Sequence, residues 1–540
     1  MRRSSFAFLL LIASLAAPAP RASAAGQTLT LVPAAGTLLS VVGTYPHDPS
    51  VCPQKQAPPL RARYRGTLTL SLNGKAVRVV ESTAFETYLR GLAEVPSSWP
   101  EEALRAQAIA ARSYALHAFR RKSGGAFDIC STDACQVYRG ATTELGAFGE
   151  RWVAAVTSTK SRVLTYRGGV IEALYFSTSD GTTGRSFPGG TPQPYFPSVS
   201  GEDGDAPLAR WTVRVPFADL GPILRAAGAW RGGAIRSVTS SSSGITVSDG
   251  ARSTAIARLD VKSALNRQAV CVFPTRYPTK GAADGGKLPS TVPGSTFSLS
   301  TSAGALVLTG RGWGHGIGMS QWGARSLAAR GRTATEILSH YYGPARITPA
   351  ADPGSIRVLA ADGLSSVSIT ANGPFTARTS DGRAVSGDAL RVLGGSSLQI
   401  LHGSGSALKP LLSIVPVRDH IEQSSGAPVT IEFTLSSAAR VSLTVTKDGK
   451  QVYALPAVSM TRGAQGLEVT LDPGTYSAVL HATDGIDDIE AAPVAIVVPF
   501  PRAPLHPSNP WPLAAGIAGA LAIAALAVAF ALRARRSSRT

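Results

Sequence analysis

The sequence Tyr88-Leu-Arg-Gly-Leu-Ala-Glu-Val-Pro96 leads almost directly into Trp99-Pro-Glu-Glu-Ala-Leu-Arg-Ala-Gln-Ala-Ile-Ala-Ala-Arg-Ser-Tyr114. The second part predicts a helix, because apolar side chains recur from Leu104 to Ala118 at spacings of three and four residues. The apolar face of this helix is mostly alanine, so we expect it to pack closely against its neighbours. Glu94 then lies just ahead of a tightly packed helix.

A second distinctive stretch is rich in glycine. It reads Gly310-Arg-Gly-Trp-Gly-His-Gly-Ile-Gly-Met-Ser-Gln-Trp-Gly-Ala324 and continues to Ile337-Leu-Ser-His-Tyr-Tyr-Gly343. Two shorter motifs precede it, Cys130-Ser-Thr-Asp-Ala-Cys-Gln-Val-Tyr138 and Ala173-Leu-Tyr-Phe-Ser-Thr-Ser-Asp-Gly181. Together with the stretch around Glu94, these motifs closely resemble the SpoIID/LytB family, which is named after stage II sporulation protein D. The resemblance covers roughly residues 60–345.

The resemblance implies that the substrate is peptidoglycan. Sporulation members of that family are lytic transglycosylases, which cleave the glycan between N-acetylmuramic acid and N-acetylglucosamine and leave a 1,6-anhydro sugar. Members of the LytB type are known as modifiers or enhancers of a wall amidase. Carried over by motif, the catalytic acid is Glu94. The resemblance favours a peptidoglycan lytic transglycosylase, and the alternative is a non-catalytic peptidoglycan-binding or amidase-enhancing module.

A single glutamate is sufficient for this chemistry. Hydrolases usually add a second carboxylate, whereas a lytic transglycosylase uses the 6-hydroxyl of the sugar as its nucleophile, so one carboxyl acts first as acid and then as base. Burial among Leu92, Val95, Pro96 and Trp99 raises the pKa of Glu94, and the N-terminus of the following helix lowers it. The sequence does not decide which effect is larger.

Five further residues are candidates for substrate binding: Ser177, Asp180, His315, Gln321 and Trp322. His315 lies among glycines, where the backbone can approach a ligand closely; it either hydrogen-bonds sugar and tunes Glu94 or belongs to a packed structural turn. Gln321 and Trp322 can line the same groove, although Trp322 fits the core equally well. Asp180 is the best candidate for a second carboxylate, but the Asp-Gly sequence favours a turn.

The four cysteines are Cys52, Cys130, Cys135 and Cys271. They allow three pairings, between which the sequence does not choose; a local bridge between Cys130 and Cys135 would leave the other two to close a long loop. Some members of the resembling family bind zinc through a histidine six residues before the first cysteine of such a Cys-x4-Cys pair. Gly124 occupies that position here, which disfavours zinc and favours a disulfide, so no cofactor is predicted.

Both ends of the chain carry apolar segments. A charged start, a short apolar stretch and Ala22-Ser-Ala24 predict a signal peptide over residues 1–24. Leu513 to Leu532 contains 20 residues without a charge and is followed by arginines, which predicts a transmembrane helix with a basic cytoplasmic tail over residues 533–540; a buried core helix is the alternative. We therefore expect an exported protein that is anchored in the membrane, with its body on the cell-wall side.

The composition fits packed globular domains. The 540 residues are 44% hydrophobic and 16% charged, with a formal net charge of +19. A basic protein attracts polyanions, for example an acidic wall polymer or anionic lipid. The alternative is a solvated basic surface without a specific partner. The chain shows no nucleic-acid-binding signature. The expected partners are peptidoglycan glycan strands, a wall amidase and the membrane, and no nucleic acid.

The expected fold class is α+β. We expect a SpoIID-like mixed α/β catalytic core with a cleft over residues 25–349, and a small β-rich region over residues 350–416. Short alternating strands with turns predict an immunoglobulin-like β-sandwich over residues 417–499, and a Pro-rich spacer over residues 500–512 leads to the one transmembrane helix. Near the start, Thr67 to Val80 predicts a β-hairpin that turns at Asn73-Gly74.

Overall fold

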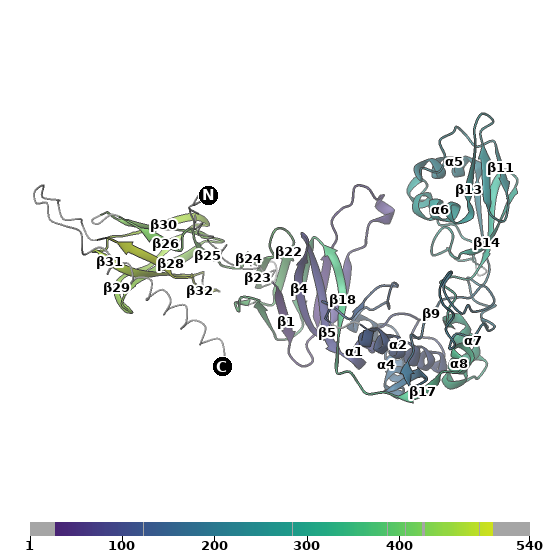
Figure 1. Ribbon diagram of the computed structural model, residues 1–540, viewed down its shortest axis with the longest axis horizontal. Helices are drawn as coiled ribbons and strands as arrows, with labels where there is room; N and C mark the ends of the chain where they lie inside the picture. The colour runs from purple at the N-terminus through teal and green to yellow at the C-terminus, as the bar shows by residue number, and fades with distance from the viewer. Residues whose placement is uncertain are drawn as a thin grey trace, which may run out of the picture. The chain divides into compact units, whose positions relative to one another are not determined.

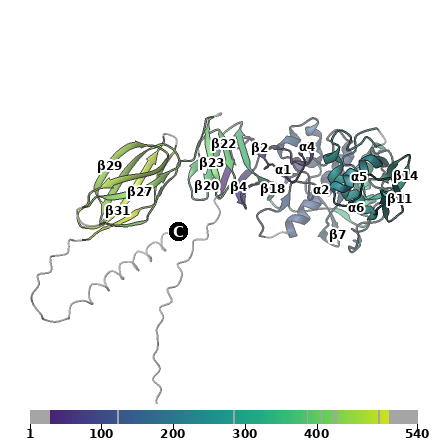
Figure 2. The same ribbon diagram turned by 90° about the horizontal axis from the view of Figure 1, so that it is seen from above.

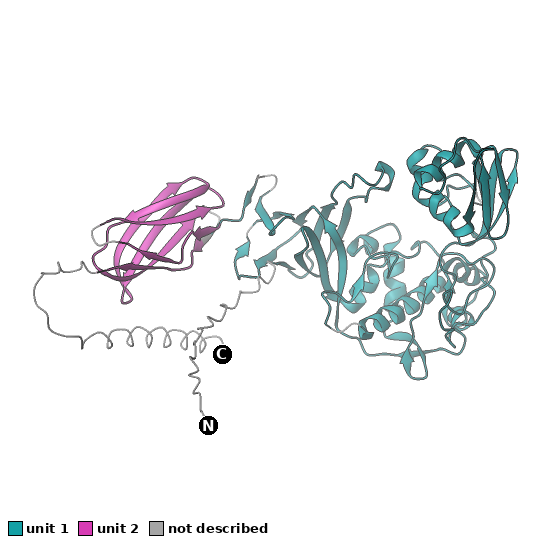
Figure 3. Cartoon of the chain, turned by 45° about the horizontal axis from the view of Figure 1, so that its top comes forward, with its two compact units in different colours: residues 1–412, 485–487 teal, residues 413–484, 488–540 magenta. Residues whose placement is uncertain are grey.

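The computed structural model describes residues 28–499, except for residues 122–123, 283–284, 386, 405–406, 424–426 and 485–486. The chain forms two compact units, the first from residues up to 412 with 485–487 and the second from the remaining residues after 412 (Figure 3). The predicted signal peptide (1–24), Pro-rich spacer (500–512), transmembrane segment (513–532) and basic tail (533–540) lie outside the described residues.

Two β-sheets of the first unit share one hydrophobic core. The seven-stranded sheet has the order β21 (Ala384–Val385), β20 (Phe375–Thr379), β1 (Leu29–Pro33), β4 (Thr67–Asn73), β5 (Ala76–Ala84), β18 (Ser355–Leu364), β6 (Ile129–Cys130). The six-stranded sheet has the order β24 (Ala407–Pro410), β23 (Gln399–Ser404), β22 (Ala389–Leu393), β19 (Ser366–Ala371), β2 (Leu39–Thr44), β3 (Leu60–Tyr64). Strands from both ends of the unit therefore lie side by side within each sheet.

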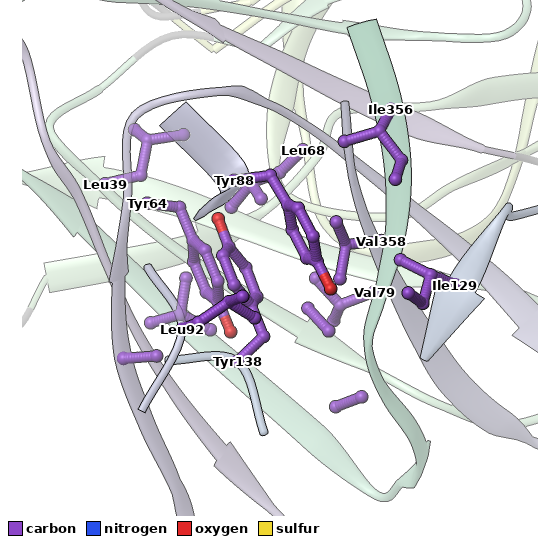
Figure 4. Close-up of a cluster of buried hydrophobic side chains, with 14 of the residues drawn as sticks. Leu39, Tyr64, Leu68, Val79, Tyr88, Leu92, Ile129, Tyr138, Ile356 and Val358 are labelled. Atoms are coloured by element: carbon purple, nitrogen blue, oxygen red, sulfur yellow. The ribbon is translucent and has the colours of Figure 1, made fainter. Parts of the chain in front are cut away.

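The hairpin of β4 and β5 illustrates why these residues form strands. The two strands pair antiparallel from Thr67 opposite Ser82 to Asn73 opposite Ala76, which confirms the hairpin predicted from the sequence. The turn needs Gly74, because its φ of 62° lies in the left-handed region. Alternate side chains along both strands are buried, and in Figure 4 Leu68 and Val79 lie beside the rings of the core.

Helices form a layer beyond the end of β5, where Figure 1 shows α1 (Phe85–Arg90), α2 (Glu101–Arg121) and α4 (Gly149–Ser158). The longest of them, α2, is buried on two sides. One side packs into the core of the sheets through leucine and alanine side chains, and the other packs into a second cluster with α7 (Gln321–Ala329) and α8 (Ala334–Tyr342). Small side chains on α2 permit this close approach on both faces.

Short elements complete the helical layer. They are α3 (Ala141–Glu144), a sheet of β17 (Arg346–Pro349), β7 (Arg162–Tyr166) and β8 (Gly169–Val170), and the parallel pair β9 (Tyr175–Phe176) and β16 (Met319–Ser320). The parallel pair joins two of the sequence motifs side by side.

A segment with its own hydrophobic core separates β9 from β16 in the chain. Figure 2 shows its helices α5 and α6 near β11 and β14. Its elements are β10 (Trp211–Pro216), α5 (Phe217–Ala226), β11 (Ser237–Ser240), β12 (Gly244–Ser248), β13 (Ser253–Ala257), α6 (Arg258–Val272), β14 (Thr296–Ser302) and β15 (Ala305–Arg311). The Cys52–Cys271 disulfide connects α6 to the loop that contains the short 3₁₀ helix η1 (Pro53–Lys55).

The second unit is built from two antiparallel-rich sheets. One contains β25 (Ile414–Pro416), β27 (Val429–Leu435) and β30 (Gly463–Val469). The other contains β26 (His420–Glu422), β33 (Val494–Val498), β31 (Gly474–Thr483), β28 (Ala439–Lys447) and β29 (Lys450–Met460), with β32 (Asp488–Glu490) paired to β31. Along β27 every second side chain is buried, the alternation typical of a strand with one face in a core.

The structure corrects the predicted fold class. Strands account for 41% of the structure and helices for 19%, so the protein is strand-rich rather than α+β with a transmembrane helix. Among the helices of the described residues, none is long and apolar enough to cross a membrane. The β-rich region predicted to follow the core is part of it, because β18 pairs with β5 and β19 pairs with β2. Hydrogen bonds between strands and a shared core join these segments, which are far apart in the chain. Local sequence patterns do not reveal such contacts.

Candidate active site

A groove of about 770 Å³ lies where the sequence motifs meet. Five of the predicted site residues line it: Glu94, Ser177, His315, Gln321 and Trp322. Asp180 does not; its carboxylate accepts a hydrogen bond of 2.9 Å from the Thr296 hydroxyl of β14. The structure therefore brings together all of these predicted residues except the proposed second carboxylate.

Glu94 lies in the short connection between α1 and α2. A strand-like contact holds this connection in place, because the N–H of Ala93 donates to the carbonyl of Val137 at 2.8 Å and Leu92 forms a bridge with Tyr138. A side chain at Gly91 would lie 2.3 Å from the Tyr138 ring, so only glycine permits this approach. The connection that carries Glu94 is thus held by hydrogen bonds and packing against the segment that follows the Cys130–Cys135 turn.

The Glu94 carboxyl receives two hydrogen bonds in the wall of the groove. Oε1 accepts from the Val137 N–H at 2.6 Å and from the Tyr175 hydroxyl at 3.1 Å. Burial raises the pKa of Glu94 to about 7, although the two hydrogen bonds oppose this effect; the negative charge of Asp133 adds to it. The sequence left the sign of the shift open, and the structure favours burial. A carboxyl with this pKa can donate a proton at neutral pH and accept it back.

A buried chain of polar groups supports the Tyr175 hydroxyl. Gln136 donates to this hydroxyl at 2.8 Å, and the Tyr88 hydroxyl donates to Gln136 at 2.7 Å. With its lone pair occupied by Gln136, the Tyr175 hydroxyl directs its own proton to Glu94. Burial and the nearby Glu94 charge raise the pKa of Tyr175, so the phenol keeps this proton.

The glycine-rich stretch contributes Trp313, Gly314 and His315 to the lining. Gly312, Gly314, Gly316 and Gly318 all have φ between 73° and 111°, which is the left-handed region that favours glycine. At Gly318 a Cβ would also lie 2.0 Å from the carbonyl oxygen of Leu174. The glycines therefore fold the stretch tightly, and the residues between them carry the side chains.

Both ring nitrogens of His315 are bound to the main chain. Nδ1 accepts from the N–H of Ile317 at 3.1 Å, so Nε2 carries the proton and donates to the carbonyl of Tyr175 at 3.0 Å. Desolvation lowers the pKa of His315, which keeps the ring neutral. His315 lines the groove but has no free nitrogen with which to exchange a proton.

Helix α7 begins at the groove and presents two predicted residues. The Gln321 side chain donates to the main-chain carbonyl of Glu94 at 3.4 Å, which connects α7 to the acid. The Trp322 ring packs edge-on against Trp99 with centroids 5.1 Å apart, and it is partly buried. Ser320 caps the helix, because its hydroxyl accepts from the N–H of Gly323.

Several lining residues escaped the sequence analysis. Asp133 and Glu172 bring further carboxylates to the groove, and Tyr114, Tyr175 and Trp313 bring aromatic rings. Tyr175 and Trp313 belong to recognised motifs, and the position of Trp313 between two glycines was a usable signal. Asp133 lies inside the Cys130–Cys135 turn, where only the fold shows that it faces Glu94.

The cysteines do not fit a zinc site. Cys130 pairs with Cys135 and Cys52 with Cys271 in disulfides, so their sulfur atoms are not thiolates that could bind a metal. Gly124 has no side chain to supply the missing ligand. Within the described part of the chain, no group of three or more His, Cys, Asp or Glu residues could hold a metal ion.

Comparison with known proteins finds a family model and several relatives to which this chain is similar. A family model described as "Stage II sporulation protein" matches residues 73–166, which include Glu94 and α2. Stage II sporulation protein D of Bacillus subtilis is 28% identical over 325 residues, covering 56% of this chain and 87% of that protein. An uncharacterized protein of Brachyspira hyodysenteriae is 29% identical over 284 residues, covering 52% of this chain and 70% of its own length.

A relative with a different printed role is similar to nearly half of this chain. The "Amidase enhancer" of Bacillus subtilis is 29% identical over 282 residues, which is 46% of this chain and 38% of that protein. The matched model, these relatives and the four ordered motifs all support the SpoIID/LytB family as the one that this chain resembles.

Proposed function

We propose that this protein acts on the bacterial cell wall as a peptidoglycan lytic transglycosylase with Glu94 as its acid and base. The family assignment supports a cell-wall role. The observation that carries the finer proposal is the partly buried Glu94 carboxyl with a pKa of about 7 in the wall of a groove.

The proposed reaction needs one carboxyl. Protonated Glu94 gives its proton to the glycosidic oxygen as the bond from this oxygen to C1 of N-acetylmuramic acid breaks. The 6-hydroxyl of the same sugar attacks C1 to form the 1,6-anhydro ring, and its proton returns to the Glu94 carboxylate. Atoms and charge balance without water, and the catalyst is regenerated in its acid form.

Two neighbours suit Glu94 to both steps. The Val137 N–H and the Tyr175 hydroxyl donate to the same carboxyl oxygen, so they stabilise the carboxylate that forms after the first step. Burial opposes ionisation in the resting groove. These opposed effects support a carboxyl that exchanges its proton near neutral pH, which is the condition for general acid–base catalysis.

A second function remains supported by one comparison. The amidase-enhancer relative is 29% identical over 282 residues, which supports a module that holds peptidoglycan glycan or positions a wall amidase without cutting. The two proposals differ in the role of Glu94: it cuts in the first and only holds in the second.

Mass analysis of the released products distinguishes the two proposals. The purified full chain is incubated with peptidoglycan glycan strands, with and without stem peptides. We expect products with 1,6-anhydro-N-acetylmuramic acid ends, and none with Glu94→Gln. Undiminished release by Glu94→Gln would contradict the role of Glu94. Glycan binding without any product would favour the second proposal.

We also propose that the protein is exported to the extracytoplasmic, cell-wall side. The predicted signal peptide over residues 1–24 supports export. The two disulfides support it independently, because disulfides persist mainly in oxidising compartments.

A further inference from the structure

Two aromatic side chains at the groove are unusually exposed. Trp313 is 42% exposed and Phe187 is 49% exposed, and both line the groove that contains Glu94. Large aromatic side chains contribute most to folding when they are buried, so two exposed rings at one concave site point to a ligand surface. Neither ring has a part in the proton transfer described above.

The main chain holds Trp313 firmly in this exposed position. Its N–H donates to the carbonyl of Thr178 at 2.8 Å, and the N–H of Thr178 donates to the carbonyl of Trp313 at 3.0 Å. The flanking Gly312 and Gly314 adopt left-handed conformations, and a Cβ at Gly312 would lie 2.7 Å from the main chain of Ser179. The fold therefore fixes the main chain at Trp313, so the indole is held at the groove before any ligand binds.

Phe187 packs against the ring of His315. The centroid of the His315 ring lies 5.5 Å from that of Phe187 and 5.5 Å from that of Phe176, and both pairs of rings are tilted. The two main-chain hydrogen bonds of His315 set the orientation of its ring. His315 is therefore a positioning residue, whose ring supports Phe187 at the groove.

We propose that Trp313 and Phe187 form a glycan subsite that binds the apolar face of a pyranose ring of the substrate strand. Pyranose rings expose C–H groups on their faces, and aromatic rings supply a flat apolar surface for them. This inference rests on the proposed function, since it names the part of the groove that binds the sugars beside the bond attacked at Glu94. Trp322, packed against Trp99, supplies a separate aromatic surface in the same groove.

The position of the subsite follows from the connections of His315. The His315 ring donates a hydrogen bond to the carbonyl of Tyr175, and the Tyr175 hydroxyl donates a hydrogen bond to Glu94. The support for Phe187 and the support for the acid thus come from the same residue of β9. A sugar on this surface therefore occupies the same groove as the cleaved bond, and the subsite affects substrate binding more than proton transfer.

Binding of a non-cleaving chain tests the subsite. The full-length Glu94→Gln variant is titrated with soluble glycan strands of N-acetylglucosamine and N-acetylmuramic acid that are free of stem peptides. Adding Trp313→Ala and Phe187→Ala together should weaken binding at least tenfold. Phe148→Ala is the matched control, because Phe148 is an aromatic side chain that is 55% exposed at the start of α4 and does not line the groove.

Conservative changes separate loss of the aromatic surface from misfolding. Trp313→Phe keeps a flat ring and should retain most of the affinity, whereas Trp313→Leu keeps apolar bulk and should lose it; circular dichroism checks that both fold. Unchanged affinity of the double alanine variant would overturn the subsite while leaving the product assay of Glu94 intact. A Glu94→Gln chain that binds no glycan would instead overturn the proposed function, and the subsite with it.

Discussion

Glu94→Gln should stabilise the protein at alkaline pH while abolishing its proposed activity. Glutamine keeps the shape of the side chain and an oxygen that accepts from the Val137 N–H and the Tyr175 hydroxyl. It cannot ionise, and so it removes the cost of a buried carboxylate. Higher stability combined with lost activity is what we expect when a residue is kept for catalysis at the expense of stability.

The magnitude follows from the two pKa values of the carboxyl. Folding raises the pKa of Glu94 from 4.5 to about 7, so the folded state binds the proton more tightly than the unfolded state. Stability from this group is complete below pH 4.5 and is lost as the pH rises through 7. Each pH unit in this window is worth about 1.4 kcal/mol, which gives at most about 3.5 kcal/mol at pH 8. Water in the open groove reduces this value.

Thermal unfolding of the full chain at several pH values between 5 and 8 measures the effect. The advantage of Glu94→Gln over the unchanged protein should grow with pH in the transition of the first unit. The transition of the second unit, which lacks the substitution, serves as an internal reference. Glu81, another buried carboxyl whose pKa burial raises to about 7, is present in both chains, so its contribution cancels.

Glu86→Gln is a control for which we expect the opposite change in stability. The Glu86 carboxylate receives two hydrogen bonds of 2.9 Å from the guanidinium of Arg112, which is only 2% exposed. Removing the charge of Glu86 leaves this buried cation without its partner, so stability at pH 8 should fall. If Glu94→Gln proved no more stable than the unchanged protein at pH 8, the argument for a buried, readily protonated acid would be refuted.

Two further changes address the groups that hold Glu94. Tyr175→Phe removes one donor to the carboxylate, which should raise the pKa of Glu94 and shift the alkaline limb of the pH–activity profile upward by about one unit; an unmoved limb would contradict the assigned hydrogen bond. Replacing both Cys130 and Cys135 with serine should loosen the turn ahead of Val137 and lower glycan-cleaving activity several-fold with the fold retained, as measured by product release and circular dichroism; full activity in this variant would show that the turn does not position the donor.

The sequence predicted most of the parts of the site. The ordered motifs indicated the family, and this resemblance implied Glu94 as the acid. The other candidates that the structure brings to the same groove are Ser177, His315, Gln321 and Trp322. Local patterns also predicted the β4–β5 hairpin and the helix that follows Glu94. These features depend on neighbouring residues, because turns, helix periodicity and short motifs are set over a few positions along the chain.

Other features depend on contacts between distant residues, and the sequence did not reveal them. The sign of the Glu94 pKa shift depends on burial among segments that are far apart in the chain. The second carboxylates of the groove are Asp133 and Glu172 rather than Asp180.

What the sequence by itself determined is the resemblance to the family and the identity of the candidate acid, because motifs are local. Only the tertiary structure decided that β18 and β19 complete sheets begun near the N-terminus and that His315 is bound through both nitrogens to the main chain. The physical reason is that strand pairing, desolvation and ring packing depend on residues far apart in sequence. None of these contacts produces a periodic pattern along the chain.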